Sequence, residues 1–137
     1  MQYRHVFHAG NFADVHKHVA LLALIALLQK KAKGFLYLDT HAGRGLYDLS
    51  EAQAQRSGEY KGGIGLLLEA PAASLPPELA AYLGLVRASA GKGHSAITAY
   101  PGSPLIVARL RRAEDRLVLA ETLPKEAAAL RDALGRA

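Results

Sequence analysis

A loop rich in glycine and polar side chains follows a short apolar run near residue 40. The run Phe35–Leu38 is apolar and aromatic, which predicts a buried strand. Residues 39–45 then read Asp-Thr-His-Ala-Gly-Arg-Gly. In open α/β sheets, ligands lie at the carboxyl ends of strands, where glycines let the backbone approach a ligand and N–H groups can face a polar or anionic group. This loop is therefore the first candidate binding site, and a glycine-rich turn without a ligand is the alternative.

The second candidate is the acid that ends the next predicted strand. Residues 116–120 are mostly apolar, and Glu121 follows them. An acidic side chain at a strand end can bind both ribose hydroxyls of a nucleoside cofactor. Glu121 lies 76 residues after Gly45, whereas dinucleotide-binding domains place this acid about 20 residues after the glycines. An insertion must therefore separate the two strands, and a strand-end acid facing water is the alternative.

The glycine spacing distinguishes two classes of cofactor. Read as the dinucleotide fingerprint G-x-G-x-x-G, the loop matches at Gly43 and Gly45, but the third position is Asp48. This mismatch disfavours a nicotinamide-dinucleotide domain. Read as Asp-x-x-x-Gly-x-Gly from Asp39, the loop resembles the first motif of class I S-adenosylmethionine-dependent methyltransferases.

The first 18 residues are polar, basic and rich in histidine. The histidines at positions 5, 8, 16 and 18 lack any HExxH or cysteine pattern, and the chain has no cysteine, so we expect no metal. Arg4 and Lys17 are suited to phosphate contacts, and Tyr3 offers an aromatic face for stacking a base. The net charge of +5 is compatible with a polyanionic partner. A disordered basic arm is the alternative.

Local patterns predict alternating helices and strands. Asn11 and Asp14 resemble a capping box, so a helix is expected from near Phe12 to about Lys31. Further helices are predicted over about 58–69, 77–89, 104–112 and 124–134, with Ser103 and Thr122 as N-caps of the last two. This order favours a parallel α/β sheet, although two clear strands make a thin one. The longest apolar run has ten residues, from Val19 to Leu28, and a membrane span needs about 20.

Four segments together resemble the RlmJ family of large-subunit ribosomal RNA adenine-N6 methyltransferases. They are YRHVFHAGNFADVHKH at 3–18, FLYLDTHAGRG at 35–45, SGEYKGGI at 57–64 and YPGSPLIVARLRR at 100–112. The resemblance covers nearly the whole chain, and its first segment is long and unusual. It implies a class I S-adenosylmethionine-dependent methyltransferase (Rossmann-like) fold that is incomplete and carries a helical insert between its first two core strands.

The resemblance also implies a role for individual residues. Positions that match S-adenosylmethionine-binding residues of the family are His18, His41, Gly43, Gly45, Ser103 and Glu121. Positions that match residues serving substrate RNA and activity are Tyr3, His5 and Lys17. The implied reaction is methylation of N6 of one adenine in 23S ribosomal RNA, in the cytoplasm.

The sequence departs from the family in its length and in its catalytic motif. Family members are about twice as long, and their catalytic Asp-Pro-Pro-Tyr motif occurs nowhere in residues 1–137. We therefore expect these residues to be the N-terminal portion of one methyltransferase domain, with 46–99 as the helical insert and no catalytic residue in this chain. We expect it to transfer no methyl group alone, and to dimerise through an exposed sheet edge. The alternative function is a non-catalytic nucleic-acid-binding module linked to extracellular DNA utilisation.

Overall fold

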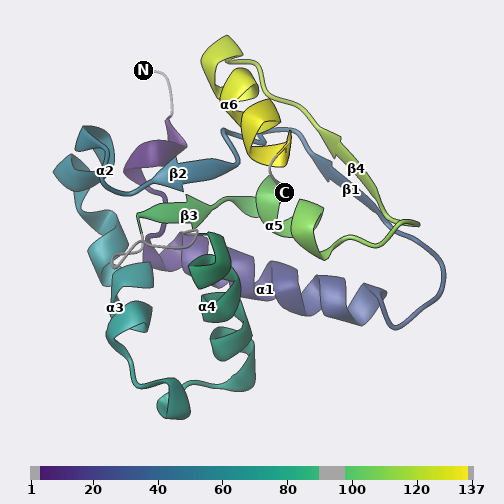
Figure 1. Cartoon of the computed structure of the whole chain (residues 1–137), viewed down its shortest axis with the longest axis horizontal. Helices are drawn as coiled ribbons and strands as arrows, with labels where there is room; N and C mark the ends of the chain where they lie inside the picture. Colours follow the sequence, from purple (N-terminus) through teal and green to yellow (C-terminus); the bar gives the residue numbers. More distant parts are fainter. Residues whose placement is uncertain (1–3, 90–97, 136–137) are drawn as a thin grey trace. The chain divides into compact units, whose positions relative to one another are not determined.

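A computed structural model describes residues 4–89 and 98–135 of the chain (Figure 1). Its backbone contacts divide the chain into two compact units. One unit comprises Met1–Leu22 and Tyr47–Tyr100, and the other comprises Ala23–Leu46 and Pro101–Ala137. Helix α1 (Phe12–Leu28) contributes its first part to the first unit and its second part to the second.

The first unit is mainly helical. Besides the start of α1, its elements are η1 (His5–Phe7), β2 (Leu46–Asp48), α2 (Ala52–Ser57), η2 (Glu59–Gly62), α3 (Ile64–Glu69), η3 (Ala72–Ser74), α4 (Pro77–Ser89) and β3 (Ala99–Pro101). Strands β2 and β3 pair with each other, and each extends by one residue into the second unit. Its fully buried side chains include Ile64, Tyr82, Val86 and Tyr100.

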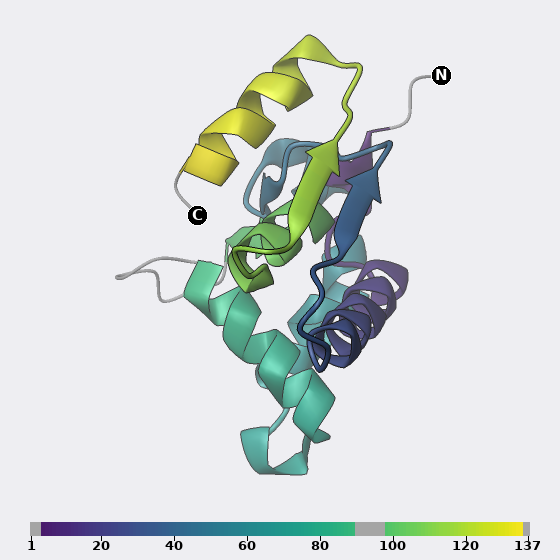
Figure 2. The same cartoon turned by 90° about the vertical axis from the view of Figure 1, so that its right-hand side faces the viewer.

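The second unit contains the predicted parallel strands. Strand β1 (Leu36–Asp39) pairs with β4 (Arg116–Leu119) in parallel, with Leu36 opposite Arg116 and Asp39 opposite Leu119. The two arrows lie side by side and point the same way in Figure 2. Helices α5 (Ser103–Leu110) and α6 (Pro124–Gly135) contact each other, and α5 also contacts β4. The prediction of a mixed α/β protein with these two parallel strands is confirmed.

One face of this small sheet is exposed and mostly apolar, with Arg116 opposite Leu36. Leu36 and Leu38 are 60% and 59% exposed, and Val118 is 48% exposed. Parallel sheets are normally covered on both faces. Dimerisation through the exposed sheet edge stays a prediction, because the structure holds a single chain.

Helix α1 begins where the capping pattern predicted. The Asn11 side chain accepts the Asp14 N–H at 2.8 Å, so one helix-terminal donor is satisfied. In a capping box the acid would bond the Asn11 N–H, but here it accepts the Gly10 N–H at 3.1 Å. The helix ends at Leu28, three residues before the predicted Lys31.

The structure corrects several expected boundaries. Ser103 is the first residue of α5 and Gly102 is its N-cap. Helix α6 begins at Pro124, two residues after Thr122, and the carbonyl of Leu123 accepts the first helical N–H. The helix predicted over 58–69 is divided into η2 and α3 at Gly63, whose backbone lies against the backbone of residues 10–12.

Five short elements were not predicted from the sequence: η1, α2, β2, η3 and β3. Strand β2 begins the segment 46–99 that was expected to be a helical insert, and β3 starts at its last residue. The strands have only three residues each, so their local pattern is weak. The division into one domain with an insert stays a prediction. Within the described ranges 4–89 and 98–135, no helix has the length and apolar character that crossing a membrane requires.

Candidate functional site

The glycine loop starts directly at the end of β1 in the second unit. Asp39 holds its first turn, because one carboxylate oxygen accepts the His41 N–H at 3.0 Å and the other accepts the Tyr37 hydroxyl at 2.9 Å. The Ala42 N–H donates to the carbonyl of Ala120 at 3.0 Å. These bonds fix the loop against the end of the neighbouring strand.

Glu121 joins the loop to the end of β4. Its Oε2 accepts the Gly43 N–H at 2.9 Å, and its Oε1 accepts the Leu123 N–H at 2.8 Å. Gly43 has φ +67°, a left-handed conformation that glycine adopts without strain. A carboxylate offers about four lone-pair sites, so the half-buried Glu121 can accept further hydrogen bonds while it holds the loop.

Gly45 and Ser103 lie at the far end of the loop. The Gly45 carbonyl accepts the Gly102 N–H at 2.7 Å. A Cβ at Gly45 would lie 2.9 Å from Cδ1 of Leu130, so this glycine serves packing against α6. Ser103 hydrogen-bonds Tyr37, whose hydroxyl pKa is raised well above its ordinary value by burial and by Asp39. Asp39, Tyr37 and Ser103 thus form a connected polar group at the strand ends.

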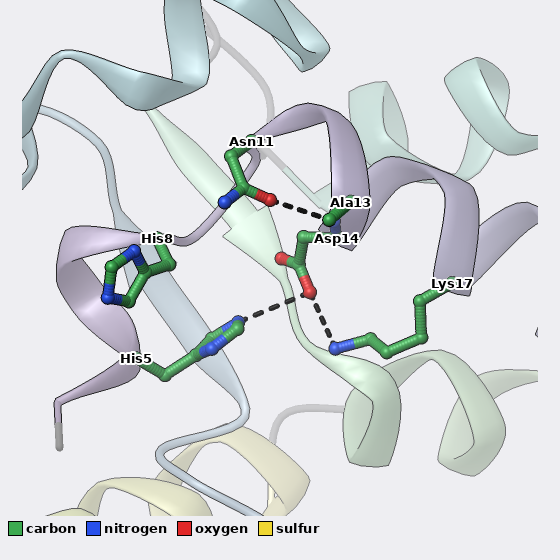
Figure 3. Close-up of a pocket in the computed structure, with 6 residues that line it drawn as sticks. All are labelled: His5, His8, Asn11, Ala13, Asp14 and Lys17. Atoms are coloured by element: carbon green, nitrogen blue, oxygen red, sulfur yellow. Dashed lines mark hydrogen bonds and ion pairs between the residues drawn. The ribbon is translucent and has the colours of Figure 1, made fainter.

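A hollow of about 380 Å³ lies in the first unit, at the start of α1 (Figure 3). Its lining residues are His5, His8, Asn11, Ala13, Asp14 and Lys17. Two of these, His5 and Lys17, are the described residues that the family resemblance connects with substrate RNA. Tyr3, the third, lies outside the described residues.

Asp14 is the buried acid of this N-terminal pocket. Its side chain is 2% exposed, and Oδ1 faces His5 Nε2 at 3.2 Å and the Lys17 ammonium. His18 Nε2 is 3.7 Å from the same oxygen. Burial raises the pKa of Asp14, but the His5 hydrogen bond and the charges of His18, His5 and Lys17 outweigh it and hold that pKa well below its ordinary value.

Two lining residues of the N-terminal pocket, His8 and Asn11, contact Glu59. Its carboxylate contacts His8 Nδ1 at 2.9 Å and accepts the Asn11 side-chain amide at 2.9 Å. The Ser57 hydroxyl donates to the Phe7 carbonyl at 2.6 Å. These contacts attach η1 and the following turn to the α2–η2 segment.

His18 belongs to a buried polar network in the same unit. Its ring is 0% exposed, and Nδ1 lies 3.0 Å from the Tyr100 hydroxyl, which is 2.8 Å from the Tyr82 hydroxyl. Burial lowers the pKa of His18 to about 4, against the opposing charge of Asp14. The imidazole is therefore neutral at pH 7 and can donate one hydrogen bond and accept another.

The predicted site residues fall into two groups. His41, Gly43, Gly45, Ser103 and Glu121 lie in the second unit, around the ends of β1 and β4, whereas His18 lies in the first unit with His5 and Lys17. Sequence reasoning did not select Tyr37 and Asp39 as site residues, although Asp39 opens the quoted glycine motif. Asp14 was assigned only to helix capping. Across residues 4–89 and 98–135, no group of three or more His, Cys, Asp or Glu is placed to hold a metal ion.

Residues 32–137 match the family described as "Ribosomal RNA large subunit methyltransferase D, RlmJ". This match covers more than half of the chain. The chain therefore belongs to the RlmJ family, as its four sequence segments predicted.

Similar proteins agree with this assignment. The chain is 43% identical over 132 residues to "Ribosomal RNA large subunit methyltransferase J" of Haemophilus influenzae, covering 96% of this chain and 46% of that protein. It is 46% identical over 131 residues to the protein of the same name from Escherichia coli K12, covering 96% and 45%. The chain thus spans about half the length of these curated relatives. A crystal structure of a Legionella pneumophila DUF519 protein matches with a TM-score of 0.77 at 40% identity, covering 89% of this chain and 43% of that one.

Proposed function

We propose that this chain is the cofactor-binding portion of an S-adenosylmethionine-dependent ribosomal RNA methyltransferase of the class I fold. The observation that carries the proposal is the hydrogen bond from the Gly43 N–H to Glu121 at the carboxyl ends of two parallel strands. Such strand ends are where α/β proteins bind nucleoside ligands. Family membership supports the reaction, because the named relatives are ribosomal RNA methyltransferases.

The residues around the two strand ends fit a nucleoside cofactor. Glu121 retains lone pairs for ribose hydroxyls after bonding the two amides. The His41 side chain is exposed in the loop, and Ser103 lies half-buried at the start of α5. S-adenosylmethionine would supply an electrophilic methyl group, and these residues would bind and orient it. His18, in the first unit, completes the proposed set.

The proposed substrate is N6 of one adenine in 23S ribosomal RNA, in the cytoplasm. Tyr3, His5 and Lys17 are the proposed RNA-contacting residues. The Lys17 side chain is 51% exposed and His5 is 24% exposed, so both are accessible at the N-terminal pocket. The net charge of +5 favours association with a polyanion.

We propose that these 137 residues bind the cofactor without transferring its methyl group. They contain no Asp-Pro-Pro-Tyr motif to accept hydrogen bonds from the adenine amino group. They also span less than half of each named relative. This proposal places residues 1–137 in one methyltransferase domain, with residues 46–99 as its insert.

Calorimetry with S-adenosylhomocysteine tests the cofactor site. We expect the wild-type chain to bind it and Glu121→Ala to bind about 10- to 100-fold more weakly, because hydrogen bonds to a charged group contribute about 1.5–3 kcal/mol. Asp132→Asn is the control, since it removes a negative charge from an exposed position on α6 of the same unit. Its affinity should equal that of the wild type.

Two results would contradict the proposal. Binding of RNA or DNA without any binding of S-adenosylhomocysteine would favour the non-catalytic nucleic-acid-binding module. Transfer of a labelled methyl group to 23S ribosomal RNA by the 137-residue chain alone would show that the missing motif is not required.

A further inference from the structure

The N-terminal pocket combines one hidden acid with two accessible side chains. The Asp14 side chain is 2% exposed, whereas its partners His5 and Lys17 are 24% and 51% exposed. A carboxylate buried this deeply offers little accessible area for contact with a large ligand. Its contribution must pass through the groups that it holds.

Asp14 connects two separate elements of the chain. His5 belongs to η1, and Lys17 lies one turn after Asp14 in α1. Both face Oδ1, while Oδ2 accepts the Gly10 N–H between the two elements. The dashed contacts in Figure 3 converge on this carboxylate from both sides. Removing it would take one charged contact from both side chains at once.

The pairing leaves Lys17 able to contact a ligand. An ammonium group has three donors, and Asp14 takes up one direction of the Lys17 head group. A lysine side chain loses considerable rotamer freedom when it binds a phosphate. A lysine already held by a buried carboxylate has lost part of that freedom beforehand, which favours binding.

We propose that Asp14 is a positioning residue that holds the His5 imidazole and the Lys17 ammonium in place to receive substrate RNA at the N-terminal pocket. This inference rests on the proposed RNA-binding function of His5 and Lys17. Asp14 acts through these two side chains and does not contact the RNA.

The direction in which RNA affinity changes when the Asp14 charge is removed distinguishes positioning from simple electrostatics. Asp14→Asn removes one negative charge from a basic protein, which by charge alone should strengthen binding to a polyanion. Positioning predicts the opposite result. Glu69→Gln is the matched control, because Glu69 is exposed at the end of α3 in the same unit, carries the same charge and does not line the pocket.

Fluorescence anisotropy with a single-stranded oligoadenylate RNA measures this difference. We expect Asp14→Asn to weaken binding about tenfold, as for the loss of one ordered charged contact, while Glu69→Gln binds as tightly as the wild type or more tightly. The plot of log affinity against log salt concentration should become shallower by about 0.7 for Asp14→Asn, the value of one phosphate contact on a single strand. Lys17→Gln should also weaken binding, and the double variant should lose less than the sum of the two single losses, because both act through the same side chain.

A second measurement uses only the wild-type chain, so it does not depend on whether a variant folds. In ¹⁵N spectra of the lysine ammonium groups, Lys17 should exchange its protons with water more slowly than the exposed Lys30 and Lys61. Equal exchange rates would overturn the inference, as would RNA binding by Asp14→Asn that is as tight as that of Glu69→Gln. If the wild-type chain binds S-adenosylhomocysteine but no RNA, the proposed role of this pocket is overturned and the cofactor proposal stands.

Discussion

At the scale of single residues, the two loop glycines serve different purposes. Gly43 has φ +67° and presents its N–H to Glu121. Gly45 has φ +77°, and the place of its missing side chain is occupied by Leu130 of α6. The first glycine therefore shapes the candidate site, and the second lets the loop pack closely on a helix.

Gly45→Ala should destabilise the chain by about 1–3 kcal/mol, because a left-handed non-glycine residue is strained and its Cβ would overlap Leu130. Gly84→Ala should have the opposite effect. Gly84 lies in the exposed middle of α4 with no atom within 4 Å of an added Cβ, so alanine should stabilise that helix by about 0.5–1 kcal/mol. Urea unfolding of both variants measures the two changes, and equal effects would contradict this assignment of roles.

At the scale of elements, the ion pair of Arg112 and Asp115 joins the α1–β1 connection to the segment before β4. Asp115 accepts the Arg112 N–H at 2.8 Å and the Phe35 N–H at 3.2 Å, and it pairs with the Arg112 guanidinium at 3.0 Å. That guanidinium also donates to the carbonyl of Lys31 at 2.9 Å. The bonds from Arg112 outweigh desolvation and hold the pKa of Asp115 well below its ordinary value.

Asp115→Asn should loosen this connection, because one side-chain amide cannot accept all of these donors. Hydrogen exchange should quicken at the Phe35 amide, and the thermal midpoint should fall. Glu114→Gln, at the exposed neighbouring position, is the control and should leave both unchanged. An Asp115→Asn protein with wild-type exchange at Phe35 would show that the carboxylate does not hold the strand start.

At the scale of the whole molecule, buried titratable groups couple the stability of the chain to pH. His18 has its pKa lowered to about 4 by burial, whereas Asp14 and Asp115 have theirs lowered by their partners. As pH falls from 6.5 to about 4, the unfolded chain takes up a proton that folded His18 does not. The unfolded state then binds more protons, so stability must rise with pH across this range.

We expect the free energy of unfolding to fall by about 3 kcal/mol between pH 6.5 and 4 on account of His18. Below pH 3.8, protonation of Asp14 and Asp115 should lower it further, because a depressed aspartate pKa stabilises only the ionised folded state. Urea unfolding at a series of pH values measures both phases. His18→Gln should remove the first phase, whereas substitution of the exposed His16 by Gln should retain it.

The sequence by itself determined those features that depend on neighbours along the chain. Apolar runs bounded by turn residues located β1 and β4, Asn11 located the start of α1, and the glycine motif and Glu121 identified the two strand ends. The four family segments determined the family. Each of these signals is carried by a few consecutive residues, so it can be read without knowing the fold.

Only the tertiary structure decided which distant side chains meet. The pairing of Gly43 with Glu121 spans 78 residues, and the contact of His18 with Tyr100 spans 82. Strands β2 and β3 likewise pair across more than 50 residues. Such contacts are selected by burial and by the need of buried polar groups for partners. Neither requirement leaves a pattern within a short stretch of sequence.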